Sequence, residues 1–333
     1  MTIVDVAASA GVSLSTASKA LNGRDRVDPE TRARVKQVAA DLGYRPNVRA
    51  RRLRNGRSHS IALLSALPST VVRNDARLGF LLELALPVAS SCLDRDYSLL
   101  LVPPLESLEK LDDLDVDGAI VVDPVADDPI ITRFTERGVK VVTVGCATAG
   151  QADGCLDRGD GGASAMIAHL AAAGARHVAA ILTHESYAST DALLGWLASP
   201  PPGAPRITIA RASAAEGIGA GERAAEALLD DPTIDAIYAP LDSFALGAVA
   251  TATRRGLAIP DQLMIATNYD GRRAAESRPP LTALDLGLAT MGADVVDLLF
   301  RVFDGDEQPR GASPTPVVVP RESTARATIP ADR

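Results

Sequence analysis

The first 44 residues carry the spacing of three short helices, and this pattern limits the possible folds more than any other part of the chain. Thr2 is placed to cap the start of the first helix, and Gly11 suits a left-handed exit from it. The apolar residues between them recur at the three- and four-residue intervals of one helix face: Ile3, Val6, Ala7 and Ala10. The sequence therefore predicts a short amphipathic helix at the start of the chain.

A second helix is predicted directly after a short turn at residues 11–13. The hydroxyl of Ser13 can accept hydrogen bonds from the free amides of that helix, whose buried face holds Ala17, Ala20 and Leu21. A turn this short does not allow the two helices to lie antiparallel, so they must cross steeply with Val12 filling the corner. This is the geometry of a helix-turn-helix.

A third helix is indicated by Asp28 as its cap, Pro29 in its first turn and Gly43 at its end. Its apolar face would complete one small core with Val35, Val38, Ala39 and Leu42. The outward face of the second helix then carries short polar side chains, one apolar contact and one long cation, which suits the major groove of DNA. These outward residues are Leu14, Ser15, Ser18 and Lys19.

The charge distribution favours a partner with negative charge at this end of the chain. Residues 1–58 contain 12 Lys and Arg against 5 Asp and Glu, a net charge of +7, whereas the remaining 22 and 37 give −15, for a total of −8. A basic run is often only a solvated surface. Here the cations coincide with a helix-turn-helix, which favours DNA binding.

The N-terminal residues resemble the signature of the LacI-type (lactose-repressor-like) family of transcription regulators. The resemblance is carried by Thr-Ile-Val-Asp-Val-Ala at residues 2–7, Ala-Gly-Val-Ser at 10–13, Thr16, Ser18, Thr-Arg at 31–32, Val35 and Leu-Gly-Tyr-Arg-Pro-Asn at 42–47. The rest of the chain resembles the same family more loosely. The resemblance implies an all-α DNA-binding head at residues 1–46, a hinge helix and linker at 47–58, and a ligand-binding and dimerisation body at 59–330.

The expected contacts with DNA divide into base reading and phosphate binding. Lys19 is expected to donate to guanine acceptors, with Leu14 against a thymine methyl group and Ser15 as an adaptable polar contact. Family members more often have arginine at the place of Lys19, and arginine can form two hydrogen bonds to guanine. Phosphates are assigned to Ser13, Thr16, Asn22 and Asn47. The full expected set is Ser13, Leu14, Ser15, Thr16, Ser18, Lys19, Asn22, Thr31, Tyr44, Asn47, Ala50 and Leu53.

Residues 47–54 predict a short helix that forms only when its charge is neutralised. Val48, Ala50 and Leu53 align roughly on one side and four arginines crowd the rest. An isolated helix below about 12 residues is marginal in water. Laid across the minor groove, Leu53 would be free to wedge between base pairs, as the resemblance also implies. The alternative is a plain basic linker, although a linker has no use for a leucine among arginines.

After Ser60 the pattern changes to short apolar runs separated by helical stretches, which predicts parallel sheets covered by helices. About 270 residues exceed one such sheet of ordinary size. Two α/β lobes of the periplasmic-binding-protein-like type are expected, with crossovers near 154–157, 284–287 and 312–316 and ligand between them. Candidate strands are 61–65, 98–102, 119–122, 139–144, 177–182, 207–209, 236–238, 263–266 and 317–319, and candidate helices include 78–93, 162–173, 221–229, 243–254 and 290–303.

The effector-binding residues are less clearly marked. Asp242 and Asp270 each follow a strand and precede a turn or helix, at places where the family has acidic residues. An Asp before a helix is more often its cap, and Phe80, which resembles the family's aromatic pocket wall, can equally be core. Gly195-Trp196 is present, but Ala192 stands where the family often has arginine, and Leu241 replaces its usual asparagine. The expected set is Phe80, Ala192, Trp196, Asp242 and Asp270.

Several classes of protein are disfavoured by what the sequence lacks. Cys92, Cys146 and Cys155 fit a reducing compartment and imply neither a disulfide framework nor a zinc site, so no metal or cofactor is expected. Neither glycine-rich run, at 159–162 or 217–221, completes a nucleotide-binding motif. No nucleophile arrangement supports catalysis, and no apolar run approaches the roughly 20 residues of a membrane span. Without a leucine heptad at the C-terminus, a dimer is expected.

The sequence therefore predicts a homodimeric, cytoplasmic, DNA-binding transcriptional regulator, most simply a repressor, controlled by a small-molecule effector. Its partners would be near-palindromic double-stranded operator DNA and that effector. The alternatives are a small-molecule sensor with no DNA target, an activator or co-repressor-dependent regulator of the same family, and an α/β enzyme. The enzyme alternative needs a motif that the sequence does not contain.

Overall fold

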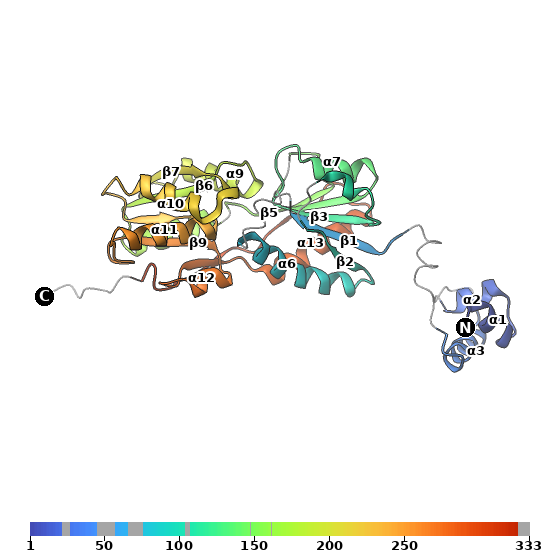
Figure 1. The fold of residues 1–333 in the computed structure, drawn as a ribbon. Coiled ribbons are helices and arrows are strands. Elements are labelled where there is room, and N and C mark those ends of the chain that lie inside the picture. The colour runs from blue at the N-terminus through green and yellow to red at the C-terminus, as the bar shows by residue number, and fades with distance from the viewer. Residues whose placement is uncertain are drawn as a thin grey trace. The chain divides into compact units, whose positions relative to one another are not determined.

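The computed structural model describes residues 1–21, 27–44, 57–65, 76–103, 107–146, 148–160 and 162–325. The chain divides into two compact units, residues 1–58 and residues 59–333. Figure 1 shows the first unit, in blue, as short helices only, and the second as sheets flanked by helices. The expected fold class, a helical head and a two-lobed α/β body, is confirmed.

The N-terminal unit is the predicted helix-turn-helix. Its helices are α1 (Ile3–Ser9), α2 (Leu14–Leu21) and α3 (Pro29–Asp41). Thr2 and Asp5 form a reciprocal capping box on α1, and the Thr2 backbone amide donates to the Asp5 carboxylate and lowers its pKa. The Ser13 hydroxyl accepts from the Thr16 amide, and Asp28 caps α3. The core is small and apolar: Val6, Ala7, Ala10, Ala17, Ala20, Val35 and Ala39.

The body contains two six-stranded sheets. The first has the order β11-β5-β4-β3-β1-β2 and is entirely parallel. The second has the order β12-β10-β9-β8-β6-β7, and only β12 runs antiparallel. The strands of the first sheet are β1 (Ser60–Ser65), β2 (Ser98–Leu101), β3 (Gly118–Val122), β4 (Lys140–Val144), β5 (Gly154–Asp157) and β11 (Arg310–Ala312). Those of the second are β6 (His177–Thr183), β7 (Arg206–Ala212), β8 (Ala236–Tyr238), β9 (Met264–Tyr269), β10 (Thr282–Asp285) and β12 (Val317–Val319).

Helices cover both faces of each sheet, as parallel strands require. In β1, Ile61 and Leu63 face one core cluster and Ala62 and Leu64 face another, so this strand is buried on both sides. Figure 1 places α6 and α13 along one side of the first sheet and α7 on the other. The helices of the body are α6 (Ala76–Leu93), α7 (Pro129–Glu136), α8 (Ala163–Ala172), α9 (Ala188–Ala198), α10 (Gly217–Leu228), α11 (Asp242–Arg254), α12 (Arg272–Glu276) and α13 (Leu288–Phe303), with short 3-10 turns at Leu108–Leu111 and Ala214–Glu216.

The chain passes between the two sheets three times. It leaves the first sheet after β5, returns between β10 and α13, and crosses again between β11 and β12. The first passage follows β5, and the other two lie at residues 286–287 and 313–316. A single core cluster includes side chains from both sheets, so the lobes share apolar contacts as well as connections.

Two expectations need correction. The strands β5, β10 and β11 were not predicted as strands, because none of them is an unbroken run of large apolar residues. The expectation of no disulfide is wrong: Cys146 and Cys155 are bonded. Their pairing follows from the neighbouring positions of β4 and β5, which spacing along the chain does not reveal. In the described part of the chain, no helix is long and apolar enough to cross a membrane.

The contact between α10 and α11 in the second lobe depends on two glycines. A Cβ at Gly221 of α10 would lie 2.5 Å from the Phe244 Cα, and one at Gly247 of α11 would lie 2.5 Å from the Ile218 carbonyl oxygen. Both obstacles are backbone atoms, which cannot rotate away. The packing of α10 against α11 therefore requires glycine at both positions.

We expect Gly247→Ala to lower the free energy of unfolding by about 3 kcal/mol, because the two helix backbones must separate. The measurement is the urea midpoint. Gly195→Ala is the control, since a Cβ there meets nothing within 4 Å in α9 and removes flexible glycine from a helix. Equal midpoints for the two variants would contradict the close backbone contact.

Candidate DNA-reading surface and effector cavity

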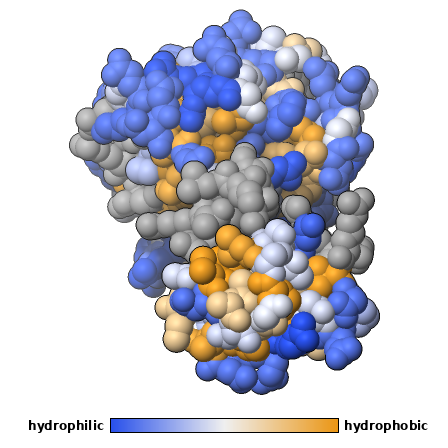
Figure 2. Space-filling view, turned by 90° about the vertical axis from the view of Figure 1, so that its right-hand side faces the viewer, coloured by the Kyte–Doolittle hydropathy of each residue, from blue (hydrophilic) through white to orange (hydrophobic). Residues whose placement is uncertain are grey.

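The DNA-reading candidates lie on the outward face of α2. Ala17 and Ala20 are fully buried against the other two helices, which leaves the opposite face to solvent. Leu14 lies on that face, outside the core of this unit, and is 51% exposed. Ser15 and Lys19 are also exposed, and Ser18 is half-buried. Figure 2 shows apolar area, in orange, on the face of the N-terminal unit in the lower half of the view.

Hydroxyl groups gather at the N-terminus of α2. The Ser13 hydroxyl lies 3.0 Å from that of Ser15 and 2.8 Å from that of Thr16. Free amides and the helix dipole make this end electropositive, so the cluster suits a phosphate. Thr31 is half-buried beside the Asp28 cap, and Tyr44 packs against the core. Four expected contacts, Asn22, Asn47, Ala50 and Leu53, lie outside the described residues.

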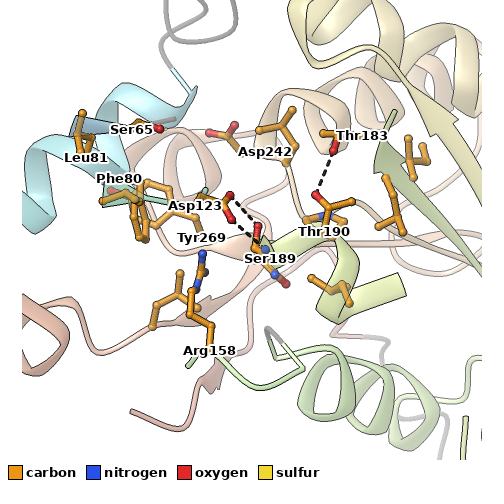
Figure 3. A pocket seen from close by; sticks show the side chains of 18 residues that line it. Ser65, Phe80, Leu81, Asp123, Arg158, Thr183, Ser189, Thr190, Asp242 and Tyr269 are labelled. Atoms are coloured by element: carbon orange, nitrogen blue, oxygen red, sulfur yellow. Dashed lines mark hydrogen bonds between the residues drawn. The ribbon is translucent and has the colours of Figure 1, made fainter. Parts of the chain in front are cut away.

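A cavity of about 100 Å³ lies in the body where the C-terminal ends of both sheets meet. The first lobe contributes residues at the ends of β1 and β3 and on α6, and the second contributes residues from β6, α9, α11 and β9 (Figure 3). Apolar side chains make up much of the lining. The lining residues are Ser65, Phe80, Leu81, Val122, Asp123, Arg158, Ile181, Leu182, Thr183, Ser189, Thr190, Leu193, Pro240, Leu241, Asp242, Asn268, Tyr269 and Leu286.

One carboxylate joins the two lobes across this cavity. Asp123 follows β3, has a positive φ of 56° and is 4% exposed. Its Oδ1 accepts from the Ser189 amide at 2.9 Å, and its Oδ2 accepts from the Ser189 hydroxyl at 2.7 Å (Figure 3). Beside it, the Ala188 amide donates to the Pro124 carbonyl at 2.9 Å. The start of α9 is therefore held against the first lobe by hydrogen bonds.

A second carboxylate enters the cavity from α11. Asp242 is the first residue of that helix and 4% exposed, and its Oδ2 lies 3.9 Å from the Arg273 Nε. The cap position belongs to Leu241, with no side-chain capping bond, so the simple cap explanation for Asp242 does not apply.

Aromatic rings and one cation form another wall. The ring of Phe80 meets that of Tyr269 edge to face at a centroid distance of 5.7 Å, and the Arg158 guanidinium lies 5.6 Å from the Phe80 centroid. Burial raises the pKa of the Tyr269 hydroxyl far above its usual value, and the neighbouring Glu83 adds to the effect. Tyr269 is therefore neutral at every physiological pH.

The structure brings only some of the expected effector residues together. Phe80 and Asp242 line the cavity, whereas Ala192, Trp196 and Asp270 do not. Asp270 forms an ion pair with Arg321 instead, and Trp196 packs against the body core. The sequence analysis missed Asp123 and Arg158. Each stands directly after a strand, β3 or β5, and that shared position is the signal that would have found them.

Both units of the chain are similar to known protein families. Residues 2–47 match the bacterial regulatory proteins of the lacI family, and residues 167–324 match the periplasmic binding protein-like domain. The HTH-type transcriptional regulator CelR of Thermobifida fusca is 27% identical over 92% of each chain. The HTH-type transcriptional repressor PurR of Escherichia coli O139:H28 is 25% identical over 97% of each chain.

The chain belongs to the LacI family of transcriptional regulators. Solved structures support the same fold for this LacI-family chain. The lac repressor dimer bound to operator and the anti-inducer ONPF has a TM-score of 0.73 at 21% identity, over 98% of this chain and 99% of that chain. The CelR–cellobiose complex has a TM-score of 0.68 at 24% identity, over 97% and 99%. The family consists of regulators, so the enzyme alternative is set aside.

In this LacI-family body, Ser189→Ala removes one of the two hydrogen bonds to Asp123 and leaves α9 otherwise unchanged. A hydrogen bond to a charged group contributes about 1.5 kcal/mol, so the Ser189 amide should exchange about tenfold faster with solvent deuterium. Ser186→Ala is the control, because its hydroxyl bonds to Asp191 within the same lobe. Unchanged exchange at residue 189 would show that the lobes are held by other contacts.

Proposed function

We propose that this LacI-family protein is a homodimeric transcription factor, a repressor in its simplest form, that binds a near-palindromic operator under the control of a small-molecule effector. The observation that carries the proposal is the exposed α2 face in a chain whose body contains an interlobe cavity. Because DNA is the target, we place the protein in the cytoplasm. A small-molecule sensor without a DNA target would have no use for residues 2–47, which match a DNA-binding family.

Two identical DNA-binding units in a two-fold dimer require two related half-sites in the operator. We assign base reading to Leu14, Ser15 and Lys19, and phosphate binding to the hydroxyl cluster at the start of α2. Ser18, Thr31 and Tyr44 are proposed as further DNA contacts, and Asn22 and Asn47 as further phosphate contacts. The hinge proposal, with Ala50 and Leu53 in the minor groove, rests on the sequence alone.

Lys19→Ala should reduce discrimination between operator and scrambled DNA by about 10- to 100-fold, since one base contact contributes about 1 to 3 kcal/mol. Fluorescence anisotropy with both duplexes at one salt concentration measures the ratio. Lys36→Ala is the matched control, because it removes the same charge from an exposed site on α3. If both variants lose affinity for both duplexes equally, Lys19 contacts phosphate only.

An apolar surface on the first lobe is the proposed dimer contact. Leu82, Leu86 and Leu93 lie on α6 and are 49%, 76% and 66% exposed. Leu101 continues the surface on β2, the edge strand that packs beside α6. Large exposed apolar groups that cluster in this way mark protein interfaces. The operator-bound lac repressor dimer supports a two-fold assembly for this chain.

Leu86→Glu should convert the protein to a monomer, because two carboxylates would face each other across a two-fold axis. Sedimentation velocity measures the state, and operator affinity should fall with it. Val317→Glu is the control, since Val317 is 62% exposed but lies on β12 of the other lobe. A dimer that survives Leu86→Glu would place the interface elsewhere.

The effector is proposed to bind between the lobes in contact with Phe80 and Asp242. The CelR–cellobiose complex supports a small-molecule ligand for this chain. The lining here is more apolar than a sugar needs, and Ala192 and Leu241 stand where the family more often places polar groups. We therefore propose a ligand screen that includes nucleosides, sugars and small acids.

A thermal-shift screen of these compounds against the whole protein should find a ligand that raises the melting temperature. Asp242→Asn and Phe80→Ala should then reduce that shift by more than half, because each alters the cavity wall. Asp270→Asn should preserve it, since the Asp270 carboxylate binds Arg321 outside the lining. Loss of the shift in Asp270→Asn alone would move the ligand site to the end of β9.

A further inference from the structure

The disulfide between Cys146 and Cys155 lies close to the contact that joins the lobes. Its Cα atoms are 5.3 Å apart, and nine positions separate the two residues in the sequence. Cys146 is half-buried in the segment after β4, whereas Cys155 is 8% exposed on β5. The remaining cysteine, Cys92, is fully buried in α6, and burial raises the pKa of its thiol to about 11. Cys92 is therefore an inert thiol at neutral pH.

Cys146 adjoins the residues that meet the second lobe. Gly145 has a φ of +88°, and a Cβ there would lie 3.2 Å from the Ala188 Cβ at the start of α9. The carbonyl of Val144 accepts from the Asp123 amide at 2.8 Å. The position of Cys146 is thus coupled through the end of β4 to the carboxylate that holds Ser189.

Cys155 lies on β5, which ends directly before the cavity residue Arg158. The Gly145 amide donates to the Leu156 carbonyl at 2.9 Å, so β4 and β5 are joined beside the disulfide. Three residues after Cys155, Arg158 enters the cavity wall. The Cys155 amide also donates to the carbonyl of Pro309, directly before β11, at 3.2 Å. The disulfide therefore connects the end of β4, which is hydrogen-bonded to Asp123, with β5, which ends directly before Arg158.

We propose that Cys146 and Cys155 form a thiol oxidation site through which a hydroperoxide tightens the contact between the lobes and so alters operator binding. Most disulfides of reducing compartments are transient and serve catalysis or redox sensing. A transcription factor of the proposed kind works in such a compartment. The relatives of this chain are regulators, which favours sensing over catalysis. The site is distinct from the effector contacts Phe80 and Asp242.

The chemistry needs only the two thiols and the hydroperoxide. The thiolate of Cys146, the more exposed sulfur, attacks the outer peroxide oxygen; the O–O bond breaks and an alcohol leaves, so Cys146 becomes a sulfenic acid. The thiolate of Cys155 then attacks the Cys146 sulfur, and the S–O bond breaks with loss of water. Two thiols are oxidised by two electrons, and the hydroperoxide is reduced to alcohol and water. A dithiol reductant reverses the change.

The first test uses the full chain, reduced and then treated with tert-butyl hydroperoxide. Alkylation after denaturation should modify three cysteines in the reduced protein and only Cys92 in the oxidised protein. Cys146→Ser and Cys155→Ser should each leave no intramolecular disulfide. Three alkylated cysteines after peroxide, at concentrations that oxidise exposed thiols, would overturn the proposal.

The second test asks whether oxidation reaches the lobe contact. In the oxidised protein the Ser189 amide should exchange about tenfold more slowly than in the reduced protein, and the melting temperature should rise by about 5 °C. Cys146→Ser, treated with peroxide, should match the reduced protein in both. A higher melting temperature without slower exchange at residue 189 would identify a structural disulfide only and would overturn the regulatory claim.

The third test measures operator affinity in both redox states, where coupling should change the dissociation constant by about fivefold or more. Cys146→Ser should bind with the affinity of the reduced protein under both conditions. Failure to bind any operator in either state would contradict the proposed function but not the thiol site, because alkylation and exchange do not involve DNA. Equal affinities in the two states, with binding intact, would overturn the regulatory link.

Discussion

Three crossovers determine what the body of this protein can do. Because the chain passes between the sheets after β5 and at residues 286–287 and 313–316, the lobes cannot separate. They can rotate only by small changes in these segments and by exchange of the contacts between them. The hydrogen bonds from Ser189 to Asp123 are such contacts, and they lie beside the cavity. Ligand binding and lobe rotation are therefore physically linked in this fold.

The DNA-binding unit depends on a different constraint, its small core. Seven buried residues, all valine or alanine, hold three helices together, so the helix ends must contribute to stability. Thr2 and Asp5, Ser13, and Asp28 each satisfy free amides at a helix start. The same arrangement leaves Leu14 and Lys19 on the outer face of α2. The core contacts and the proposed DNA reading use opposite faces of one helix.

The proposed effector binding and the proposed thiol oxidation both act on one part of the first lobe. The cavity has Asp123 and Arg158 in its wall. The disulfide joins the end of β4, where the Val144 carbonyl accepts from the Asp123 amide, to β5, which ends directly before Arg158. A ligand acts on these residues through contacts, whereas oxidation acts on them through the backbone of β4 and β5. Either input changes the same equilibrium between lobe positions, and a few kcal/mol of differential free energy suffices to shift its population.

Local sequence was enough to predict the elements whose signals are local. The caps at Thr2, Ser13 and Asp28 and the helices of the head follow from residues within one turn of each other. Longer strands and helices of the body were also predictable, because each is long enough to show its apolar pattern. The two-lobed α/β class follows from their alternation. The exposed face of α2 was identified in the same way.

Local sequence did not predict all of the cavity residues or the disulfide, because both depend on which strands lie next to each other in the folded protein. Phe80 and Asp242 were foreseen at the cavity, but Asp123 and Arg158 reach it only because parallel strands of two sheets end at one place. The sequence predicted equivalent roles for Asp270 and Asp242. In the structure Asp270 instead binds Arg321, which is 51 residues away in the sequence. Cys146 and Cys155 become neighbours through the pairing of β4 with β5. Caps and periodicity act over one turn of chain, so the sequence alone determined the elements; contacts between distant segments arise only on folding, so the tertiary structure decided the site.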